Sequence, residues 1–187
     1  MNIDFEHALQ EHQKAIQSVL EQSVKIERIV NEITTAIAGG GKVIWLGNGG
    51  SAADAQHMAA ELMVRYVKNR QPIASIALTT DTSILTAHSN DYSFDTVFSR
   101  QIEGLAQPQD VVIGLSTSGE SINVVNAIKA ANQKGCFTVA MTGGGENLLC
   151  QLSNLCLSVA SNETARVQEA HSFASHLVCE GLDGLFS

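Results

Sequence analysis

The sequence predicts an α/β fold, a doubly wound sheet of five parallel strands flanked by helices, with an extra helical segment at the N-terminus. Short apolar runs without polar alternation are separated by segments whose apolar residues recur at helical spacing. This alternation is typical of parallel strands that are buried on both faces. Aromatic residues make up only 5% of the chain. The core must therefore be built from Ala, Val, Ile and Leu, which suits interior strands.

The N-terminal segment is predicted to be helical and to lack an adjoining strand. Residues 4–38 carry apolar side chains at helical spacing, which indicates one long helix or two shorter ones. Three glycines at 39–41 end this pattern. The segment either covers the sheet as a lid or forms an oligomer interface, and the sequence alone leaves both open.

Strands and helices alternate after residue 41. We expect strands at residues 42–47, 74–80, 110–116, 136–143 and 155–160. We expect helices at residues 51–67, 82–88, 94–105, 121–135 and 164–182. No shift in composition marks a boundary, so residues 1–187 are predicted to form a single domain with a helical segment at about 1–40.

The charge and the hydropathy pattern exclude several classes of function. The formal net charge is −8 and the basic residues are scattered, whereas nucleic-acid backbones are bound by a basic face. The first residues are polar and acidic, and no apolar stretch approaches transmembrane length. We therefore expect a cytoplasmic protein that binds neither nucleic acid nor membrane directly. The four cysteines, at 136, 150, 156 and 179, show no CxxC spacing and are predicted to be buried free thiols.

Two loops at predicted strand ends are candidate phosphate sites. The first, GNGGS at Gly47–Ser51, follows a strand and opens a helix, so its amides face outward at a helix N-terminus. The second, STSGES at Ser116–Ser121, places four hydroxyls and a glycine in the same setting. The first is equally explained as a tight turn with a capping serine. Neither loop has the lysine of a Walker motif, and GxGxxG is absent, so nucleotide binding is disfavoured.

A histidine and a glutamate share one face of the helix that follows the first loop. His57 and Glu61 are four residues apart, and Arg65 stands one further turn along. Such a face is often no more than a solvated polar stripe. Its start at a candidate ligand loop favours a role in metal binding or proton transfer.

The last predicted helix carries a second polar group. Gln168 and His176 lie about 80° apart around the helix axis, so both can reach a common point. His171 lies to the other side of Gln168, and spacing alone does not choose between the two histidines. Asn90 and Asp91 fall in a predicted loop, where they either contact a polyhydroxylated ligand or simply form a turn.

At these residues the chain resembles a known family. The segments GNGGSAADAQHMAAEL, RYVKNR, SNDYSFDTVFSRQIE, DVVIGLSTSGES and ARVQEAHSFASH resemble, in order, the phosphoheptose isomerase branch of the SIS family. The resemblance covers nearly the whole chain. It implies a flavodoxin-like layered sheet and a homotetramer with active sites at subunit contacts.

The resemblance also implies the site residues. It assigns the catalytic acid–base roles to Glu61 and His176, and one Zn²⁺ per subunit to His57, Glu61, Gln168 and His176. The residues it implies for substrate binding are Asn48, Gly49, Gly50, Ser51, Arg65, Asn90, Asp91, Ser116, Thr117, Ser118, Ser121 and Gln168.

The implied reaction is a ketose–aldose isomerisation. Sedoheptulose 7-phosphate becomes D-glycero-D-manno-heptose 7-phosphate through an enediol, as a step toward ADP-heptose and lipopolysaccharide. A carboxylate or imidazole held by zinc is a poorer proton acceptor, because its lone pair is engaged. Glu61 and His176 therefore cannot freely be ligands and catalysts at once.

Other functions stay open at this stage. A related adaptor, which associates with the bacterial replication initiator and is not an enzyme, shares much of the pattern but lacks the final histidine, here His176. Further alternatives are a sugar-phosphate sensor without turnover and an isomerase of another phosphorylated ketose. Ala165 stands where some relatives have an aspartate that contacts the substrate, and Thr164 or Glu163 could substitute for it.

Overall fold

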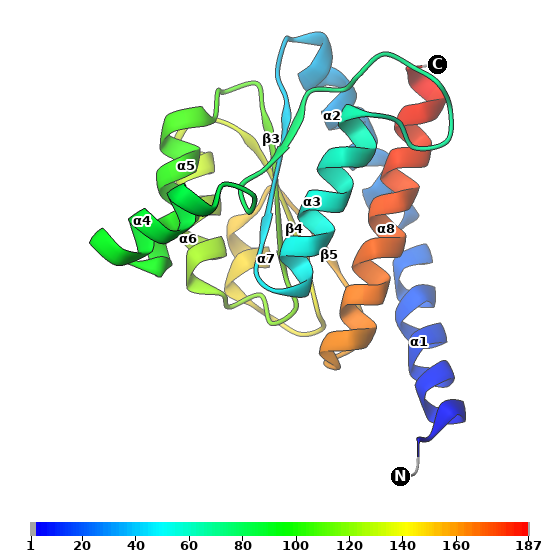
Figure 1. Ribbon diagram of the computed structural model, residues 1–187. Coiled ribbons are helices and arrows are strands. Elements are labelled where there is room, and N and C mark those ends of the chain that lie inside the picture. Colours follow the sequence, from blue (N-terminus) through cyan, green and yellow to red (C-terminus); the bar gives the residue numbers. More distant parts are fainter. Residues whose placement is uncertain (1–2, 187) are drawn as a thin grey trace.

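The protein forms one five-stranded parallel sheet with helices on both faces, as predicted. The computed structural model describes residues 3–186 (Figure 1). The strands lie in the order β2-β1-β3-β4-β5 and every neighbouring pair is parallel. Their bounds are β1 Val43–Gly47, β2 Ser75–Ala77, β3 Val111–Ser116, β4 Phe137–Thr142 and β5 Leu155–Ser158.

The strand order creates a crevice beside the first strand. The chain moves from β1 outward to β2 and then returns to place β3 on the other side of β1. Gly47 pairs with Leu115, so β1 and β3 end side by side. Ligands of doubly wound sheets bind at such a reversal point, beyond the carboxyl ends of the strands. Both candidate phosphate loops begin there.

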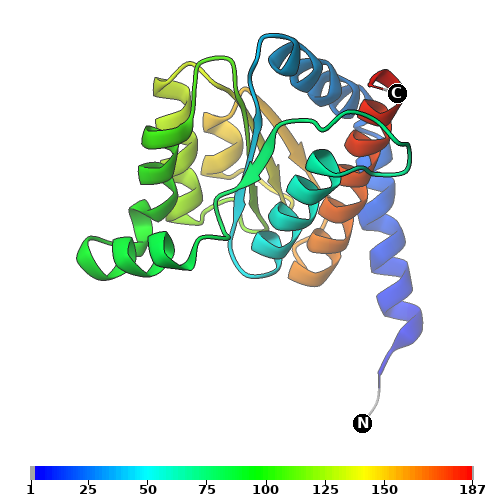
Figure 2. The same ribbon diagram turned by 45° about the horizontal axis from the view of Figure 1, so that its top comes forward.

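Alternating side chains of the strands build two apolar layers. Trp45 packs in a cluster with α1 (Phe5–Leu20), α2 (Ser23–Ala38), α3 (Gly50–Met63) and α8 (Thr164–Leu185). Ile44 and Leu46 point to the opposite side, where they pack with α5 (Val97–Leu105), α6 (Ile122–Gln133) and α7 (Leu148–Leu152). Figure 2 shows α3 and α8 side by side on their face of the sheet.

The N-terminal segment is two helices, α1 and α2, that pack against α8. The break between them is held by Gln22, whose Nε2 donates to the carbonyls of Ser18 and Ser158, both at 2.8 Å. Part of α1 remains uncovered, because Phe5 and Leu9 are 75% and 56% exposed. The segment therefore covers the sheet and also leaves an apolar surface.

Several predicted boundaries were wrong. The helix expected at residues 51–67 ends at Met63, so Arg65 lies in a loop and not on the helix face. Asn90 and Asp91 are the last residues of helix α4 (Thr82–Asp91), and not part of a loop. The helix expected at 94–105 divides into a 3-10 turn, η1 (Phe94–Thr96), and α5. The short helix α7 was not predicted.

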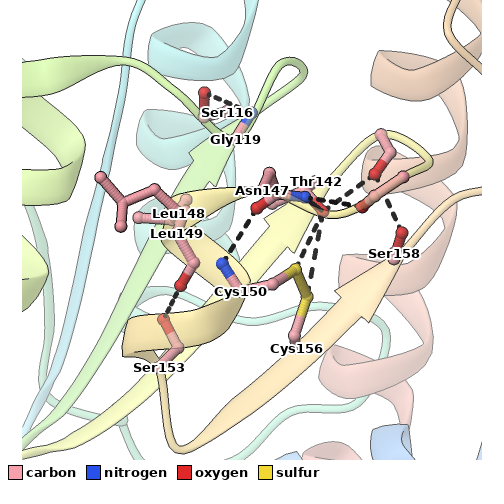
Figure 3. Close-up of a disulfide and its surroundings, with 12 residues drawn as sticks. Ser116, Gly119, Thr142, Asn147, Leu148, Leu149, Cys150, Ser153, Cys156 and Ser158 are labelled. Carbon is pink, nitrogen blue, oxygen red and sulfur yellow. Dashed lines mark hydrogen bonds between the residues drawn. A yellow bond between two sulfur atoms is a disulfide. The ribbon is translucent and has the colours of Figure 1, made fainter.

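The prediction of four free thiols was wrong for two of them. Cys136 and Cys179 are buried and free, as expected. Cys150 and Cys156 form a disulfide that joins α7 to β5 (Figure 3). They are six positions apart in sequence, and their Cα atoms are 5.0 Å apart. The turn from α7 into β5 brings the two together, which their spacing did not reveal. Within residues 3–186, no helix is long and apolar enough to cross a membrane.

Candidate active site

The glycine loop brings backbone amides and the side chain of Gln168 to one place. Gly49 has a φ of 56°, a left-handed conformation that glycine adopts without strain. A Cβ atom on Gly50 would come within 2.5 Å of Nε2 of Gln168, so only glycine allows this approach. Asn48 is fixed by two reciprocal amide hydrogen bonds with the buried Asn123, at 2.8 and 2.9 Å.

The hydroxyl-rich loop faces the glycine loop across the ends of β1 and β3. Oγ of Ser116 lies 2.9 Å from Oγ of Ser121 and 3.4 Å from Oγ of Ser118. Ser121 is the N-cap of α6, yet its side chain makes no capping hydrogen bond. Its hydroxyl is thus available to an anion at the helix N-terminus, where the amides and the helix dipole favour negative charge.

The segment that follows β4 packs against the hydroxyl-rich loop at Gly119. Gly119 has a φ of 68°, and a Cβ atom there would collide with the side chain of Asn147. The amide of Leu149 donates to the carbonyl of Gly119 at 3.0 Å. Figure 3 shows Asn147 between this loop and the disulfide. Asn147 is buried. It was not identified from the sequence, because an asparagine in a polar turn is common and does not stand out.

The two loops enclose a cavity of about 240 Å³. Its lining contains eight of the predicted binding residues: Asn48, Gly49, Gly50, Ser51, Ser116, Thr117, Ser121 and Gln168. Leu115 and Thr164 also line the cavity, and Thr164 stands next to Ala165. None of the lining side chains carries a charge. An anion here would be held by amides, hydroxyls and the dipole of α6.

A second polar group lies along the contact between α3 and α8. Nε2 of His57 is 3.1 Å from Oε1 of Glu61, as the four-residue spacing predicted. The ring centroids of His57 and His176 are 5.1 Å apart. Gly50 meets Gln168 nearer the start of each helix, so the two helices run parallel. The cavity and this imidazole–carboxylate group are successive parts of one α3–α8 surface.

The structure chooses between the two histidines of α8. His176 is half-buried, and the ring of Tyr66 stacks on it at 5.6 Å between centroids. His171 is fully buried, and neither of its ring nitrogens has a hydrogen-bond partner among the described residues. Burial lowers the pKa of His171 to about 4; a backbone group of Thr142, near the ring but outside hydrogen-bond geometry, opposes this shift. His171 is a neutral packing residue, and His176 belongs to the site.

Asp54 is a site residue whose role the sequence did not reveal. It stands on α3 one turn before His57. Burial raises the pKa of Asp54, while the nearby His57 and His176 partly offset the increase. In the sequence, the only sign of Asp54 was that it shares the polar face of the helix with His57. Its proximity to His57 follows from the helix itself, whereas its proximity to His176 depends on how α8 packs against α3.

The donor set suits zinc, although the side chains are not arranged as a metal site. Zinc in proteins is bound by imidazole nitrogens and carboxylate oxygens, which His57, His176 and Glu61 supply. Within residues 3–186, no three His, Cys, Asp or Glu side chains are clustered closely enough to hold a metal ion. Gln168 points toward Gly50 and lines the cavity. Metal binding would require these side chains to turn toward one point.

Ser118 stands in the hydroxyl-rich loop but does not line the cavity, and three further predicted binding residues do not line it either. Arg65 is exposed and donates from Nη1 to the carbonyl of Val67 at 3.2 Å. Asn90 and Asp91 bond to each other at 2.9 Å on the exposed end of α4. Figure 1 shows α4 on the side of the molecule away from α8. The single chain therefore does not bring these residues to the cavity.

The comparison with known proteins agrees with this geometry. The model of the SIS domain matches residues 4–143. The chain belongs to the SIS-domain family. A probable phosphoheptose isomerase from Thermoplasma acidophilum is 51% identical over 162 residues, which cover 87% of this chain and 89% of the relative. The phosphoheptose isomerase of Geobacter metallireducens is 45% identical over 188 residues and covers all of both chains.

A solved structure supports the same placement within the SIS-domain family. Phosphoheptose isomerase GmhA from Neisseria gonorrhoeae superposes with a TM-score of 0.86 at 38% identity, over 96% of this chain and 95% of that one. The predicted family and fold are thus confirmed, and the chain lies in the phosphoheptose isomerase branch.

Proposed function

We propose that this protein is a phosphoheptose isomerase that converts sedoheptulose 7-phosphate to D-glycero-D-manno-heptose 7-phosphate. The observation that carries the proposal is the continuity of two sites along α3 and α8. A neutral cavity suited to an anion begins at Gly50 and Gln168. Further along, Glu61 pairs with His57, whose ring lies next to that of His176. The two relatives described above are named as phosphoheptose isomerases, one of them as a probable one.

The cavity accounts for binding of the substrate phosphate. Ser116, Thr117 and Ser121 supply hydroxyls, and the start of α6 supplies amides and a favourable dipole. Amide and hydroxyl donors hold a phosphate without the lysine that this lining lacks. The sugar chain of the substrate would then extend along α3 toward His57 and Glu61.

Glu61 and His176 supply the proton transfers in this proposal. Glu61 removes a proton from C1 of the ketose, which gives an enediol, and the proton is returned to C2. His176 acts as its acid–base partner at the substrate oxygens. Groups of this kind each contribute about 10²–10⁴-fold to the rate.

We also propose one zinc ion per subunit, held by His57, Glu61, Gln168 and His176. When bound, zinc would supply Lewis acidity toward the carbonyl and hydroxyl oxygens of the sugar. A Glu61 carboxylate engaged with a metal is a weaker base, so in this proposal Glu61 acts as base only when released from it. A Gln carbonyl is a weak ligand, which favours such an exchange.

The site is proposed to be completed by subunit contacts in a homotetramer. The outlying Arg65, Asn90 and Asp91 would contact substrate in the site of a neighbouring subunit or at its rim. The exposed apolar residues of α1, Phe5 and Leu9, support an interface on that helix. We place the protein in the cytoplasm, where phosphorylated sugars are available for the synthesis of ADP-heptose and lipopolysaccharide.

The deciding experiment is isomerisation of sedoheptulose 7-phosphate by purified, zinc-loaded protein, followed by NMR. We expect the aldoheptose phosphate to appear with wild type. Glu61→Gln and His176→Ala should each reduce kcat at least 10²-fold. Glu27→Gln, an exposed change on α2, serves as the control and should keep wild-type activity. No turnover by folded, zinc-bound wild type would refute the proposal and favour another phosphorylated ketose or a non-enzymatic role.

A further inference from the structure

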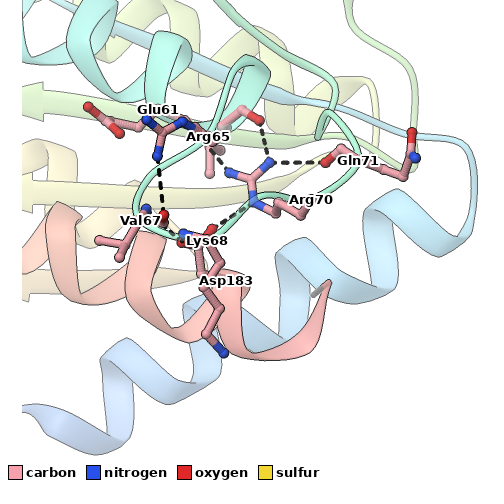
Figure 4. A network of polar contacts seen from close by, with 8 residues as sticks. Glu61, Arg65, Val67, Lys68, Arg70, Gln71 and Asp183 are labelled. Carbon is pink, nitrogen blue, oxygen red and sulfur yellow. Dashed lines mark hydrogen bonds and ion pairs between the residues drawn. The ribbon is translucent and has the colours of Figure 1, made fainter.

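A buried ion pair between Arg70 and Asp183 fixes the segment between α3 and β2, and neither residue has a role in the mechanism above. Nε of Arg70 lies 2.7 Å from Oδ1 of Asp183, on α8. The two side chains are 0% and 3% exposed. Removing either partner of a buried pair leaves the other charge uncompensated, so the contact is strongly specified. Figure 4 shows the pair beneath the loop that carries Arg65.

Arg70 caps the C-terminal end of the helix that carries Glu61. Its Nη2 donates to the carbonyl of Glu61 at 2.9 Å, and its Nη1 donates to the carbonyl of Leu62 at 2.9 Å. Carbonyls in the last turn of a helix lack partners within the helix, and a cation there is favoured by the helix dipole. The guanidinium thus holds the backbone of the proposed base itself.

Asp183 holds the loop that follows the helix. Its Oδ2 accepts hydrogen bonds from the amides of Val67 and Lys68, both at 2.8 Å. The loop carries Tyr66 immediately before these amides, and the Tyr66 ring stacks on His176 with an angle of 26° between the planes. One carboxylate on α8 thereby determines where a neighbour of the proposed acid–base histidine lies.

We propose that Arg70 and Asp183 are positioning residues, which set the relative placement of Glu61 and His176 for proton transfer. This inference rests on the proposed isomerase function. The pair connects the end of α3, the loop with Tyr66, and α8 through hydrogen bonds of 2.7–2.9 Å. A displacement of about 1 Å in such a group can reduce a rate about 10²-fold.

A second ion pair in the same chain provides a matched control. Nζ of Lys42 lies 2.6 Å from Oδ2 of Asp110, whose side chain is 1% exposed. Asp110 also accepts from the amides of Lys42 and Gln107. This pair lies at the start of β1 and β3, which is the opposite edge of the sheet from the cavity. The Lys42 side chain is 24% exposed, so its loss leaves a buried aspartate unpaired without disturbing the site.

The test compares Arg70→Met and Asp183→Asn with Lys42→Met in steady-state isomerisation of sedoheptulose 7-phosphate. We expect the first two variants to lose about 10–100-fold in kcat with KM within about threefold of wild type, because the phosphate cavity is untouched. Lys42→Met should keep both constants while losing thermal stability. Arg70→Lys retains the positive charge but lacks the planar guanidinium that binds several acceptors at once. Its kcat should therefore lie between those of wild type and Arg70→Met.

A second readout does not depend on turnover. The ring of Tyr66 stacks on that of His176, so the NMR shift of the His176 imidazole protons reports the stacking. The Tyr66→Leu variant shows how much the Tyr66 ring contributes to this NMR shift. We expect Arg70→Met and Asp183→Asn to move the signal toward that of Tyr66→Leu, and Lys42→Met to leave it in place.

Each outcome decides the inference. It is overturned if Arg70→Met and Asp183→Asn lose no more kcat than Lys42→Met, or if the His176 signal does not move in them. If Arg70→Met does not fold, the same comparison is made with Arg70→Lys and Asp183→Asn. If wild type itself has no isomerase activity, the proposed function fails, and the His176 signal alone decides whether the pair places these residues.

Discussion

Gly50 lies directly against the side chain of Gln168, so that a Cβ atom on Gly50 would come within 2.5 Å of Nε2 of Gln168. This contact joins the first turn of α3 to the first half of α8 at the rim of the cavity. It explains why the third glycine of the GNGGS loop, Gly50, is needed. The requirement comes from a close approach and not from the backbone angle of Gly50.

Gly50→Ala should impair the site and spare the fold. The added methyl displaces the end of a flexible side chain, and alanine is the better helix former by roughly 1 kcal/mol. We expect kcat/KM to fall about tenfold or more as Gln168 moves, with an unchanged melting temperature. Gly104→Ala is the control, because Gly104 is exposed on α5 and a Cβ atom there meets nothing within 4 Å. Equal activity of the two variants would contradict the role of this contact.

Ser116→Ala should weaken phosphate binding. Oγ of Ser116 lies 2.9 Å from Oγ of Ser121, and a hydrogen bond to a charged group is worth about 1.5–3 kcal/mol. We expect KM for the sugar phosphate to rise about 10–100-fold with a smaller effect on kcat. Ser153→Ala removes a hydroxyl outside the cavity lining that donates to the carbonyl of Leu149 at 2.8 Å, and should leave KM unchanged. A normal KM for Ser116→Ala would place the phosphate elsewhere.

His171 should make the protein less stable as the pH falls. Its pKa is lowered from 6.5 to about 4 by burial, so the unfolded chain binds a proton between these values and the folded protein does not. The free energy of unfolding is therefore unaffected by protonation of His171 above about pH 6.5. It falls by about 3 kcal/mol in total as the pH decreases from 6.5 toward 4. Melting temperatures measured from pH 7 to pH 4.5 should decline less steeply in His171→Leu. His88→Gln, a change at a surface histidine, should keep the wild-type slope.

The disulfide can be checked by counting thiols. Purified protein that is denatured without reductant should be alkylated at Cys136 and Cys179 only, and at all four cysteines after reduction. Cys150 and Cys156 are half-buried, so cytoplasmic reductants can reach them. Protein alkylated in intact cells should therefore carry four labels if it is cytoplasmic as proposed. Four labels on the purified, unreduced protein would exclude the Cys150–Cys156 bond.

The elements with a strong period were predictable because their pattern is local. The strand at Val111–Ser116 is a run of buried residues, and the helix at Ile122–Gln133 follows an N-capping serine. His57 and Glu61 were placed together correctly, since four residues span about one helical turn. Seven of the eight predicted cavity residues come from two loops that each follow a strand, and parallel strands end at a common edge; the eighth, Gln168, comes from α8.

Other features depend on contacts between distant segments. Nothing local ends α3 at Met63; Arg70 and Asp183 do so by binding its last carbonyls and the amides beyond it. Likewise His171 and His176 are equivalent in spacing, and only the packing of α8 buries one against the sheet and turns the other toward His57. The sequence by itself determined the type and order of the strongly periodic strands and helices and the two loops that follow strands, because these follow from side-chain period and turn chemistry. The tertiary structure decided which polar groups meet, because burial and hydrogen bonding between segments far apart in the chain have no local signature.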